Sequence, residues 1–163
     1  MRRLHIPLLL LFLSLLLSLP AWAFRATVVS VHDGDTVTLD TGQRVRLVAV
    51  DAPEMVARGR WGGQPGAESA RAYLAALVLG QAVDVREAGQ KPSHGRTVAD
   101  IILPGGVSAA ASMVASGWAW AEPRYCRGYC WQLRELESRA RGDGLGVWAG
   151  EAVPPWEWRK GRE

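Results

Sequence analysis

The stretch DGDT at residues 33–36 is followed ten residues later by RLVAVDAPE at residues 46–54, and these two motifs organise the rest of the chain. They place carboxylates and an arginine at the ends of two short apolar runs. Hard divalent cations prefer oxygen ligands, and carboxylates supply oxygen together with compensating charge. An arginine beside such a cluster can hold a phosphate through its planar fork of donors. The pattern therefore predicts a cation site next to a phosphate-binding arginine.

Short strands surround these motifs. Residues 25–31 are rich in β-branched side chains, which indicates a strand, and Asp33-Gly34 is a strong turn signal. Residues 36–40 are expected to form a second strand. Residues 44–47 alternate polar and apolar side chains, which predicts a third strand with one solvated face. Pro53 ends the pairing, because proline cannot donate to a ladder.

Helices and two further strands follow. We expect helices at 67–79, 107–116 and 131–141, strands at 82–87 and 96–103, and a short extended segment at 118–121. Gly80 is the expected C-terminal stop of the first helix. Three consecutive strands, a helix, two strands and then helices are typical of an α+β fold. Five strands fit an OB-type β-barrel, here with three α-helices.

The N-terminus has the composition of an export signal. Met1-Arg2-Arg3 gives a positive start, residues 7–19 are an almost unbroken leucine run, and Ala21-Trp22-Ala23 offers a small-x-small cleavage site. A retained membrane anchor is the alternative, but the apolar run is near the short end of what spans a bilayer. We therefore expect a signal peptide at 1–23 and an exported protein, periplasmic or secreted, without stable membrane association after cleavage.

The remaining chain has the size of one domain, which we place at 24–150, with a Pro- and Trp-containing tail at 151–163 and a monomeric state. The formal net charge of +3 falls to +1 without Arg2 and Arg3, because 17 basic residues then face 16 acidic ones. Global basicity is thus a weak argument for a nucleic-acid partner. A local basic site would have to attract one.

Two cysteines, Cys126 and Cys130, lie beyond the predicted signal. Export implies an oxidising compartment, which favours a disulfide. At i and i+4 on a regular helix the Cβ atoms are about 5–6 Å apart, whereas a disulfide needs about 3.8 Å. Pairing therefore requires a turn or a frayed helix start, which Gly128 permits. A metal site is the alternative, but no other thiol and no nearby histidine completes a ligand set.

Further motifs extend the pattern: HGR at 94–96, MVASGWA at 113–119 and LGVW at 145–148. Together with the two opening motifs they resemble the thermonuclease (staphylococcal nuclease-like) family over roughly residues 26–148. The tail PWEWR at 155–159 is similar to that of exported bacterial members. The resemblance implies a five-stranded OB barrel with three helices. It also implies a Ca²⁺-dependent endonuclease or exonuclease that acts on DNA and RNA, cleaves the bond to the 5′ oxygen and leaves 3′-phosphate ends.

The resemblance assigns the metal ligands by motif position. Asp35 and Asp51 would be the direct calcium carboxylates, and the backbone carbonyl of Ala52 a third ligand. Many relatives carry a threonine where Ala52 stands, so a hydroxyl is lost while the carbonyl remains. The plainer interpretation makes Asp33 and Asp35 turn residues and lets Asp51 cap a bend; Asp33 is left as a turn residue or a neighbour of the ligands.

The same positions imply that Arg46 and Arg96 hold the scissile phosphate and that Glu54 faces the attacking water. Phosphodiester hydrolysis builds negative charge on phosphorus, which two fixed guanidinium groups and a dication stabilise. Glu54 could accept a proton through one water, and whether it acts as base or as water positioner stays open. In the plainer interpretation Arg46 is a solvated strand residue that pairs with Asp40, and Glu54 is a surface acid.

Two substrate contacts are expected at His94 and Tyr125. Many relatives carry a tyrosine where His94 stands, at a position that contacts the terminal phosphate of a bound nucleotide in the resemblance. His94 can still donate a hydrogen bond, and it is charged only at mildly acid pH. Tyr125 would stack or hydrogen-bond near a nucleotide, or else pack at a helix start. Trp61, in a polar loop, is the tryptophan best placed to stack a base.

Three functions remain in competition. The leading one is an exported metal-dependent nuclease. An inactive OB-fold module that binds single-stranded nucleic acid is the alternative, since OB folds often bind without cutting. The presence of all five candidate side chains argues against it, because a decayed enzyme would have lost at least one. A calcium-binding structural protein would not need two arginines beside the carboxylates.

Overall fold

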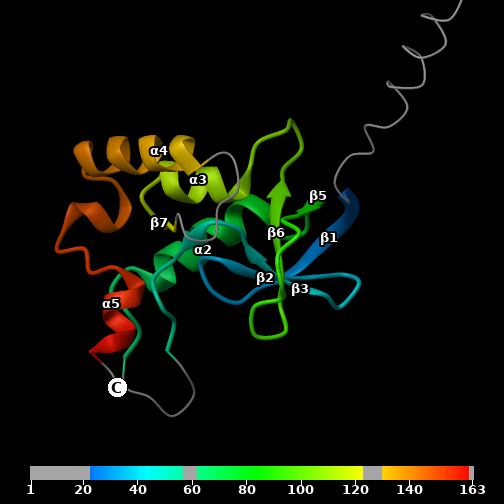
Figure 1. Ribbon diagram of the computed structural model, residues 1–163, viewed down its shortest axis with the longest axis horizontal. Coiled ribbons are helices and arrows are strands. Elements are labelled where there is room, and N and C mark those ends of the chain that lie inside the picture. The colour runs from blue at the N-terminus through cyan, green and yellow to red at the C-terminus, as the bar shows by residue number, and fades with distance from the viewer. Residues whose placement is uncertain (1–22, 57–61, 123–129, 162–163) are drawn as a thin grey trace, which may run out of the picture.

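The computed structural model describes residues 23–56, 62–122 and 130–161 (Figure 1). Within these ranges no helix is long and apolar enough to cross a bilayer. The predicted signal lies outside them, except for Ala23, which begins the first strand. The export signal therefore remains a prediction.

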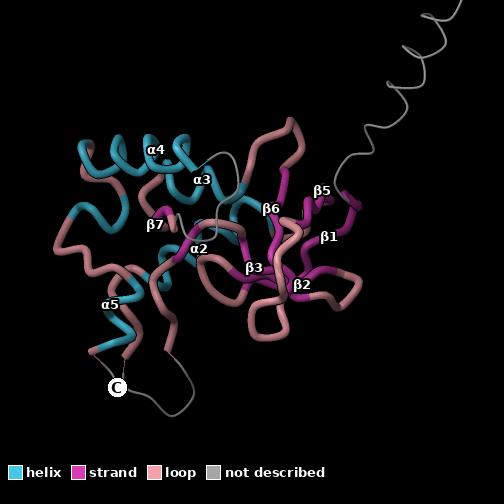
Figure 2. The backbone as a smooth tube through the Cα atoms, in the orientation of Figure 1, coloured by secondary structure: helices cyan, strands magenta, loops and turns pink. Residues whose placement is uncertain are grey.

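Five strands close into a barrel, as the sequence predicts (Figure 2). In chain order they are β1 Ala23–Val31, β2 Thr36–Leu39, β3 Arg44–Leu47, β5 Ala82–Glu87 and β6 Thr97–Ile102. Around the barrel the order is β1-β2-β3-β6-β5. β3 and β6 pair in parallel, and the other neighbours are antiparallel.

Alternating side chains fill the barrel. Val28, Val37, Val45, Val85 and Ile101 are fully buried, one from each strand. On β3 the inward positions Val45 and Leu47 are buried, whereas the intervening Arg46 points outward and stays partly exposed. Because β3 pairs in register with β6, Arg46 lies opposite Val98, close to where β6 begins. The barrel wall thus carries a charged side chain at the seam of two strands.

A two-stranded sheet joins the barrel to the helices. β4 (Val50–Asp51) pairs antiparallel with β7 (Trp120–Ala121), and Asp51 lies opposite Trp120. The turn that leads into β4 contains Ala49, whose φ is 59°. Every residue from Leu47 to Ala52 is buried, so the backbone that carries Asp51 is held on both sides.

The three predicted helices are present as α2 (Ala67–Val78), α3 (Ala109–Ala115) and α4 (Cys130–Gly142). α3 and α4 pack against each other, α2 contacts α3 and the barrel strand β1, and α3 also contacts β6 (Figure 1). After the 3₁₀ turn at Gly146–Ala149, the tail forms a further helix, α5 (Pro155–Lys160). No helix was predicted there. Pro155 at the first position has the fixed φ that a helix start requires.

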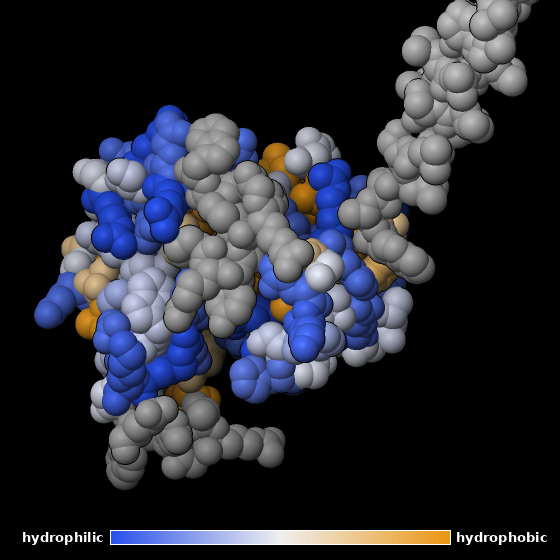
Figure 3. All heavy atoms as spheres, in the orientation of Figure 1, coloured by the Kyte–Doolittle hydropathy of each residue, from blue (hydrophilic) through white to orange (hydrophobic). Residues whose placement is uncertain are grey.

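The face shown in Figure 3 is hydrophilic over α4 and around α5. On α4 this surface carries the exposed pairs Arg139–Glu135 and Arg141–Glu137. Beneath it the ring of Trp148 lies between Arg141 and Trp120: the Arg141 guanidinium is 4.1 Å from the centroid of Trp148, and the two tryptophan rings meet edge to face at 4.9 Å. These two tryptophans therefore fill the space beneath α4.

Candidate functional site

The two predicted metal carboxylates meet on one guanidinium. Arg46 Nη1 donates to Asp35 Oδ1 at 2.9 Å, and Arg46 Nη2 donates to Asp51 Oδ1 at 2.8 Å. Asp35 precedes β2, and Asp51 ends β4. Both carboxylates are almost completely buried, at 5% and 3% side-chain exposure. The turn before β2 and the bend after β3 therefore bring the two opening motifs to a single point, as the sequence predicts.

Asp35 sits in a dense set of hydrogen bonds. Its Oδ1 accepts from the Thr36 hydroxyl at 2.8 Å, and its Oδ2 accepts from the Ala52 N–H at 3.2 Å. Asp33 also contacts this aspartate: Asp33 Oδ1 accepts from the Asp35 N–H at 3.0 Å. Burial first, and then the charge of Asp33, raise the pKa of the Asp35 carboxyl to about 7, although Arg46 opposes the shift. The buried Asp35 carboxyl therefore holds a proton more readily than an exposed aspartate does.

This donor set fits a hard dication. Oxygen atoms of Asp35 and Asp51 lie beside the Ala52 backbone, and an added positive charge would relieve the crowding of carboxylates. Within the described ranges no three His, Cys, Asp or Glu side chains form a ready metal cluster. The predicted set of metal ligands does not need three such side chains, because it consists of two carboxylates and the backbone carbonyl of Ala52.

Arg96 reaches the same cluster from the other side of the parallel seam. Its Nη1 donates to Thr36 Oγ1 at 3.1 Å across 60 residues of sequence, and its Nε donates to the Ser93 carbonyl at 3.1 Å. Because Thr36 donates in turn to Asp35, one hydroxyl links Arg96 to the buried carboxylate. Arg46 and Arg96 therefore lie on the same side of the barrel.

A cavity of about 270 Å³ opens between these groups. Its lining includes Asp51 together with basic side chains and an imidazole: Arg46, Lys91, His94, Arg96 and Arg159. The protein thus has a local group of basic side chains, which a nucleic-acid partner would need because the net charge of the chain is low. His94 lines it as predicted, from a backbone with a φ of 52° and beside the Ser93 hydroxyl at 3.3 Å.

Other predicted positions lie outside the described residues. These are Tyr125 and Trp61, together with Cys126 of the predicted disulfide. Its partner Cys130 is the first residue of α4. The pairing of Cys126 with Cys130 and the contact of Tyr125 with substrate both stay predictions.

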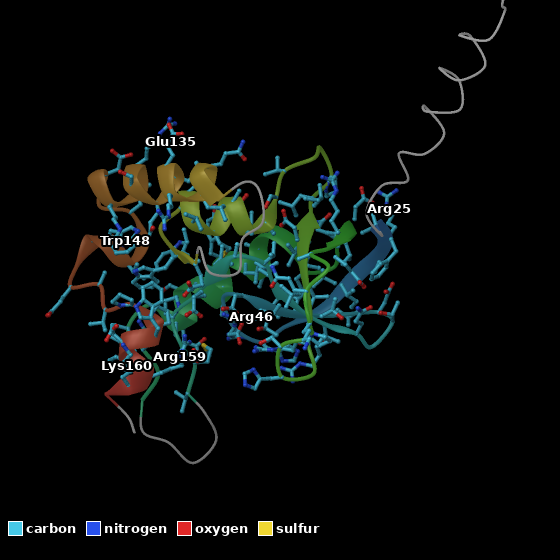
Figure 4. The ribbon with its side chains drawn as sticks, in the orientation of Figure 1. Arg25, Arg46, Glu135, Trp148, Arg159 and Lys160 are labelled. Carbon is cyan, nitrogen blue, oxygen red and sulfur yellow. The ribbon has the colours of Figure 1, made fainter. Side chains whose placement is uncertain are left out.

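Glu54 lies next to Asp51, and the group that joins them is Arg159, which sequence reasoning missed. Arg159 Nη2 donates to Asp51 Oδ2 at 2.7 Å, and Arg159 Nη1 donates to Glu54 Oε1. Figure 4 shows Arg159 rising from α5 toward Arg46. Gln64 was also missed: its Oε1 accepts from the Glu54 N–H at 3.1 Å. The PWEWR motif of the tail was the one sequence signal that could have pointed to Arg159. Nothing in that motif indicates that Arg159 binds Glu54 and Asp51, which lie 105 and 108 residues away.

The loop between the first two strands tolerates no side chain at Gly34. A Cβ there would lie 2.6 Å from Ala52 Cβ and 2.9 Å from Ala70 Cβ. We expect Gly34→Ala to lower the free energy of unfolding by about 1–3 kcal/mol through overpacking. Thermal denaturation measures this, with Gly142→Ala as the matched control because a Cβ at Gly142 meets open space. Equal melting temperatures of the two variants would contradict the expectation.

Comparison with known proteins bears on what this site does. A family model described as staphylococcal nuclease homologue matches residues 44–150. The chain is 38% identical over 159 residues to "Micrococcal nuclease" of Shigella flexneri, covering 90% of this chain and 87% of that protein. It is 35% identical over 159 residues to "Protein ParB" of Escherichia coli, covering 90% and 85%. An "Uncharacterized endonuclease" of Haemophilus influenzae is 30% identical over 138 residues, covering 82% and 71%.

Proposed function

Because this chain belongs to the staphylococcal nuclease family, we propose that it is a Ca²⁺-dependent nuclease that hydrolyses phosphodiester bonds of both DNA and RNA. The observation that carries the proposal is the contact of one guanidinium, that of Arg46, with the buried carboxylates of Asp35 and Asp51 at the wall of a basic cavity. Arg96 lines the same cavity. A cation site beside two arginines is suited to phosphodiester hydrolysis, because both stabilise the negative charge that develops on the phosphate.

Asp35, Asp51 and the carbonyl of Ala52 would hold the cation. When bound, the cation supplies positive charge against the phosphate and orients and acidifies a water molecule. Asp35 Oδ2 accepts from the Ala52 N–H and Asp51 Oδ2 accepts from Arg159, so each of these oxygens keeps a second acceptor direction for the cation while Arg46 stays on the Oδ1 atoms. The N–H of Ala52 and the hydroxyl of Thr36 keep the Asp35 carboxylate fixed while it does so.

The phosphate would lie between Arg46 and Arg96, whose donors match its non-bridging oxygens. Glu54 accepts the proton of the attacking water as the water oxygen bonds to phosphorus. The bond from phosphorus to the 5′ oxygen breaks, the 5′ oxygen takes up a proton from a solvent water, and the phosphate remains on the 3′ oxygen. His94, at the rim of the cavity, would bind the terminal phosphate of the product.

Removal of the cation tests this proposal. The purified protein is expected to degrade DNA and RNA in millimolar Ca²⁺, to stop in excess EGTA, and to resume when Ca²⁺ is added back in excess. A series of Mg²⁺, Mn²⁺ and Sr²⁺ at equal concentration identifies the preferred ion. The DNA fragments should prime a polymerase only after phosphatase treatment, because a 3′-phosphate blocks extension.

The same experiment separates the competing functions. A single-strand-binding module would shift DNA in a gel without cutting it in any metal. A calcium-binding structural protein would gain thermal stability with Ca²⁺, by mass action on the folded state, and would neither cut nor bind DNA. Activity that survives EGTA undiminished would contradict a metal-dependent mechanism. Export to the periplasm or medium and a monomeric state are proposed with this function, on the sequence evidence given above.

A further inference from the structure

The short helix α5 brings a third guanidinium to the site. Arg159 donates to both oxygens of Asp51, at 2.7 Å to Oδ2 and 3.4 Å to Oδ1, and its Nη1 also donates to Glu54 Oε1. One planar fork thus spans two carboxylates. Arginine is suited to this because its donors lie in a fixed plane, whereas a lysine ammonium is a point charge on a flexible stem.

A second, independent contact ties the tail to Glu54. The side chain of Gln64 is buried, and its amide works in two directions: Oε1 accepts from the Glu54 N–H at 3.1 Å, and Nε2 donates to the Val153 carbonyl at 2.6 Å. Gln64 also donates its own N–H to the Glu54 carbonyl at 2.8 Å. The segment that leads into α5 therefore holds the backbone of Glu54, while Arg159 holds its carboxylate.

This bridge differs from the surface ion pairs of the chain. Arg139–Glu135 and Arg141–Glu137 join residues four apart on α4, in a geometry that contributes little to stability. Arg159 instead reaches a carboxylate that is only 3% exposed and lies 108 residues away in sequence. The ion pairs of Arg159 therefore hold the tail helix α5 against the carboxylates of Asp51 and Glu54.

We propose that Arg159 is a positioning residue, which acts through Glu54 and makes α5 part of the active site. The Glu54 side chain is 38% exposed and would otherwise sample several rotamers. Arg159 holds Oε1 toward Asp51, which leaves Oε2 to accept the proton of the attacking water. Asp51 keeps free acceptor directions for the cation. The inference rests on the proposed nuclease function and adds to it a residue outside the opening motifs.

The first test separates turnover from binding. Arg159→Ala is expected to lower kcat about 10- to 100-fold, the usual cost of removing a group that orients a reacting side chain, with KM nearly unchanged. Arg159→Lys should recover part of kcat, since an ammonium keeps the positive charge but lacks the rigid planar fork that spans the two carboxylates. Lys160→Ala is the matched control: Lys160 neighbours Arg159 on α5 but pairs with exposed Glu157, so wild-type kinetics are expected.

A double-mutant cycle decides whether Arg159 acts through Glu54. If it does, Arg159→Ala costs nothing further in a Glu54→Ala background at saturating Ca²⁺, because Glu54→Ala removes the contact with Arg159. If the fold losses in kcat of the two single variants multiply in the double variant, the proposal is overturned. So would an increase in KM with unchanged kcat, which would make Arg159 a substrate contact. Unchanged kcat and KM for Arg159→Ala would overturn it as well.

Folding and the proposed function are controlled in the same set of measurements. If Arg159→Ala melts below the assay temperature, Arg159→Gln, which keeps the aliphatic stem, is judged by the same criteria. Wild-type protein that fails to cleave in Ca²⁺ would refute the nuclease proposal itself. A wrong assignment of Arg159 would leave the wild type active and would appear in the variants alone, by the criteria given above.

Discussion

Glu54→Gln is expected to lower kcat about 10²- to 10⁴-fold, because an amide cannot take a proton from the attacking water. The substitution keeps the shape of the side chain and an oxygen that can still accept from Arg159. Binding of Ca²⁺ and of uncleaved DNA should therefore be close to that of the wild type. Initial rates at saturating Ca²⁺, with binding measured by calorimetry and by fluorescence anisotropy, give the three quantities needed.

Glu68→Gln is the matched control. Glu68 is an exposed acid on α2 that pairs with Arg71 and touches nothing at the site, so its loss should leave kcat unchanged. If Glu54→Gln turns over at the wild-type rate, Glu54 is not the base. If it loses Ca²⁺ binding instead, Glu54 belongs to the metal ligands.

Arg46→Ala is expected to lower kcat about 10²- to 10³-fold, the typical cost of removing one fixed donor from a developing charge. Its contacts predict a second effect. Without Arg46, the buried carboxylates of Asp35 and Asp51 lose a shared partner, and the metal-free protein should be less stable by about 1–3 kcal/mol. Ca²⁺ should restore much of that stability, because it brings positive charge back to the same oxygens.

Arg44→Ala separates these effects from a general change in charge. Arg44 lies on the same strand two residues earlier and is exposed. Its removal should leave the melting temperature in EGTA nearly unchanged and should change kcat by no more than a small factor. Thermal denaturation with and without Ca²⁺ then tests Arg46 directly. An Arg46→Ala protein that is as stable as the wild type in EGTA, or that cleaves at its rate, would contradict the assignment.

Local signals predicted the barrel well. The bounds of β3 and β5 agree with the expected ranges to the residue, because apolar alternation and flanking turn residues mark both strands. The helix α2 stops one residue before the expected end, since Leu79 is already extended and Gly80 turns the chain at a φ of 74°. β6 begins at Thr97 because Arg96 is used in a bridge to Ser93.

The site residues were predictable where they lie in the two opening sequence motifs. Asp35, Arg46 and Asp51 lie within two short motifs, and the barrel joins them as expected. Gln64 and Arg159 could not be found in that way. Each acts through long-range hydrogen bonds that neither composition nor periodicity encodes, and α5 is too short to show a helical repeat.

The parallel pairing of β3 with β6 has a kinetic consequence. Register partners such as Val45 and Thr97 are separated by the whole α2–β5 segment, so the loop between them must close before that contact forms. Such non-local closure is slow compared with the formation of local hairpins. The β1–β2–β3 meander already contains Asp35, Thr36 and Arg46, but Arg96 reaches the Thr36 hydroxyl only when β6 pairs with β3. Arg46 and Arg96 therefore come together only when β6 pairs with β3.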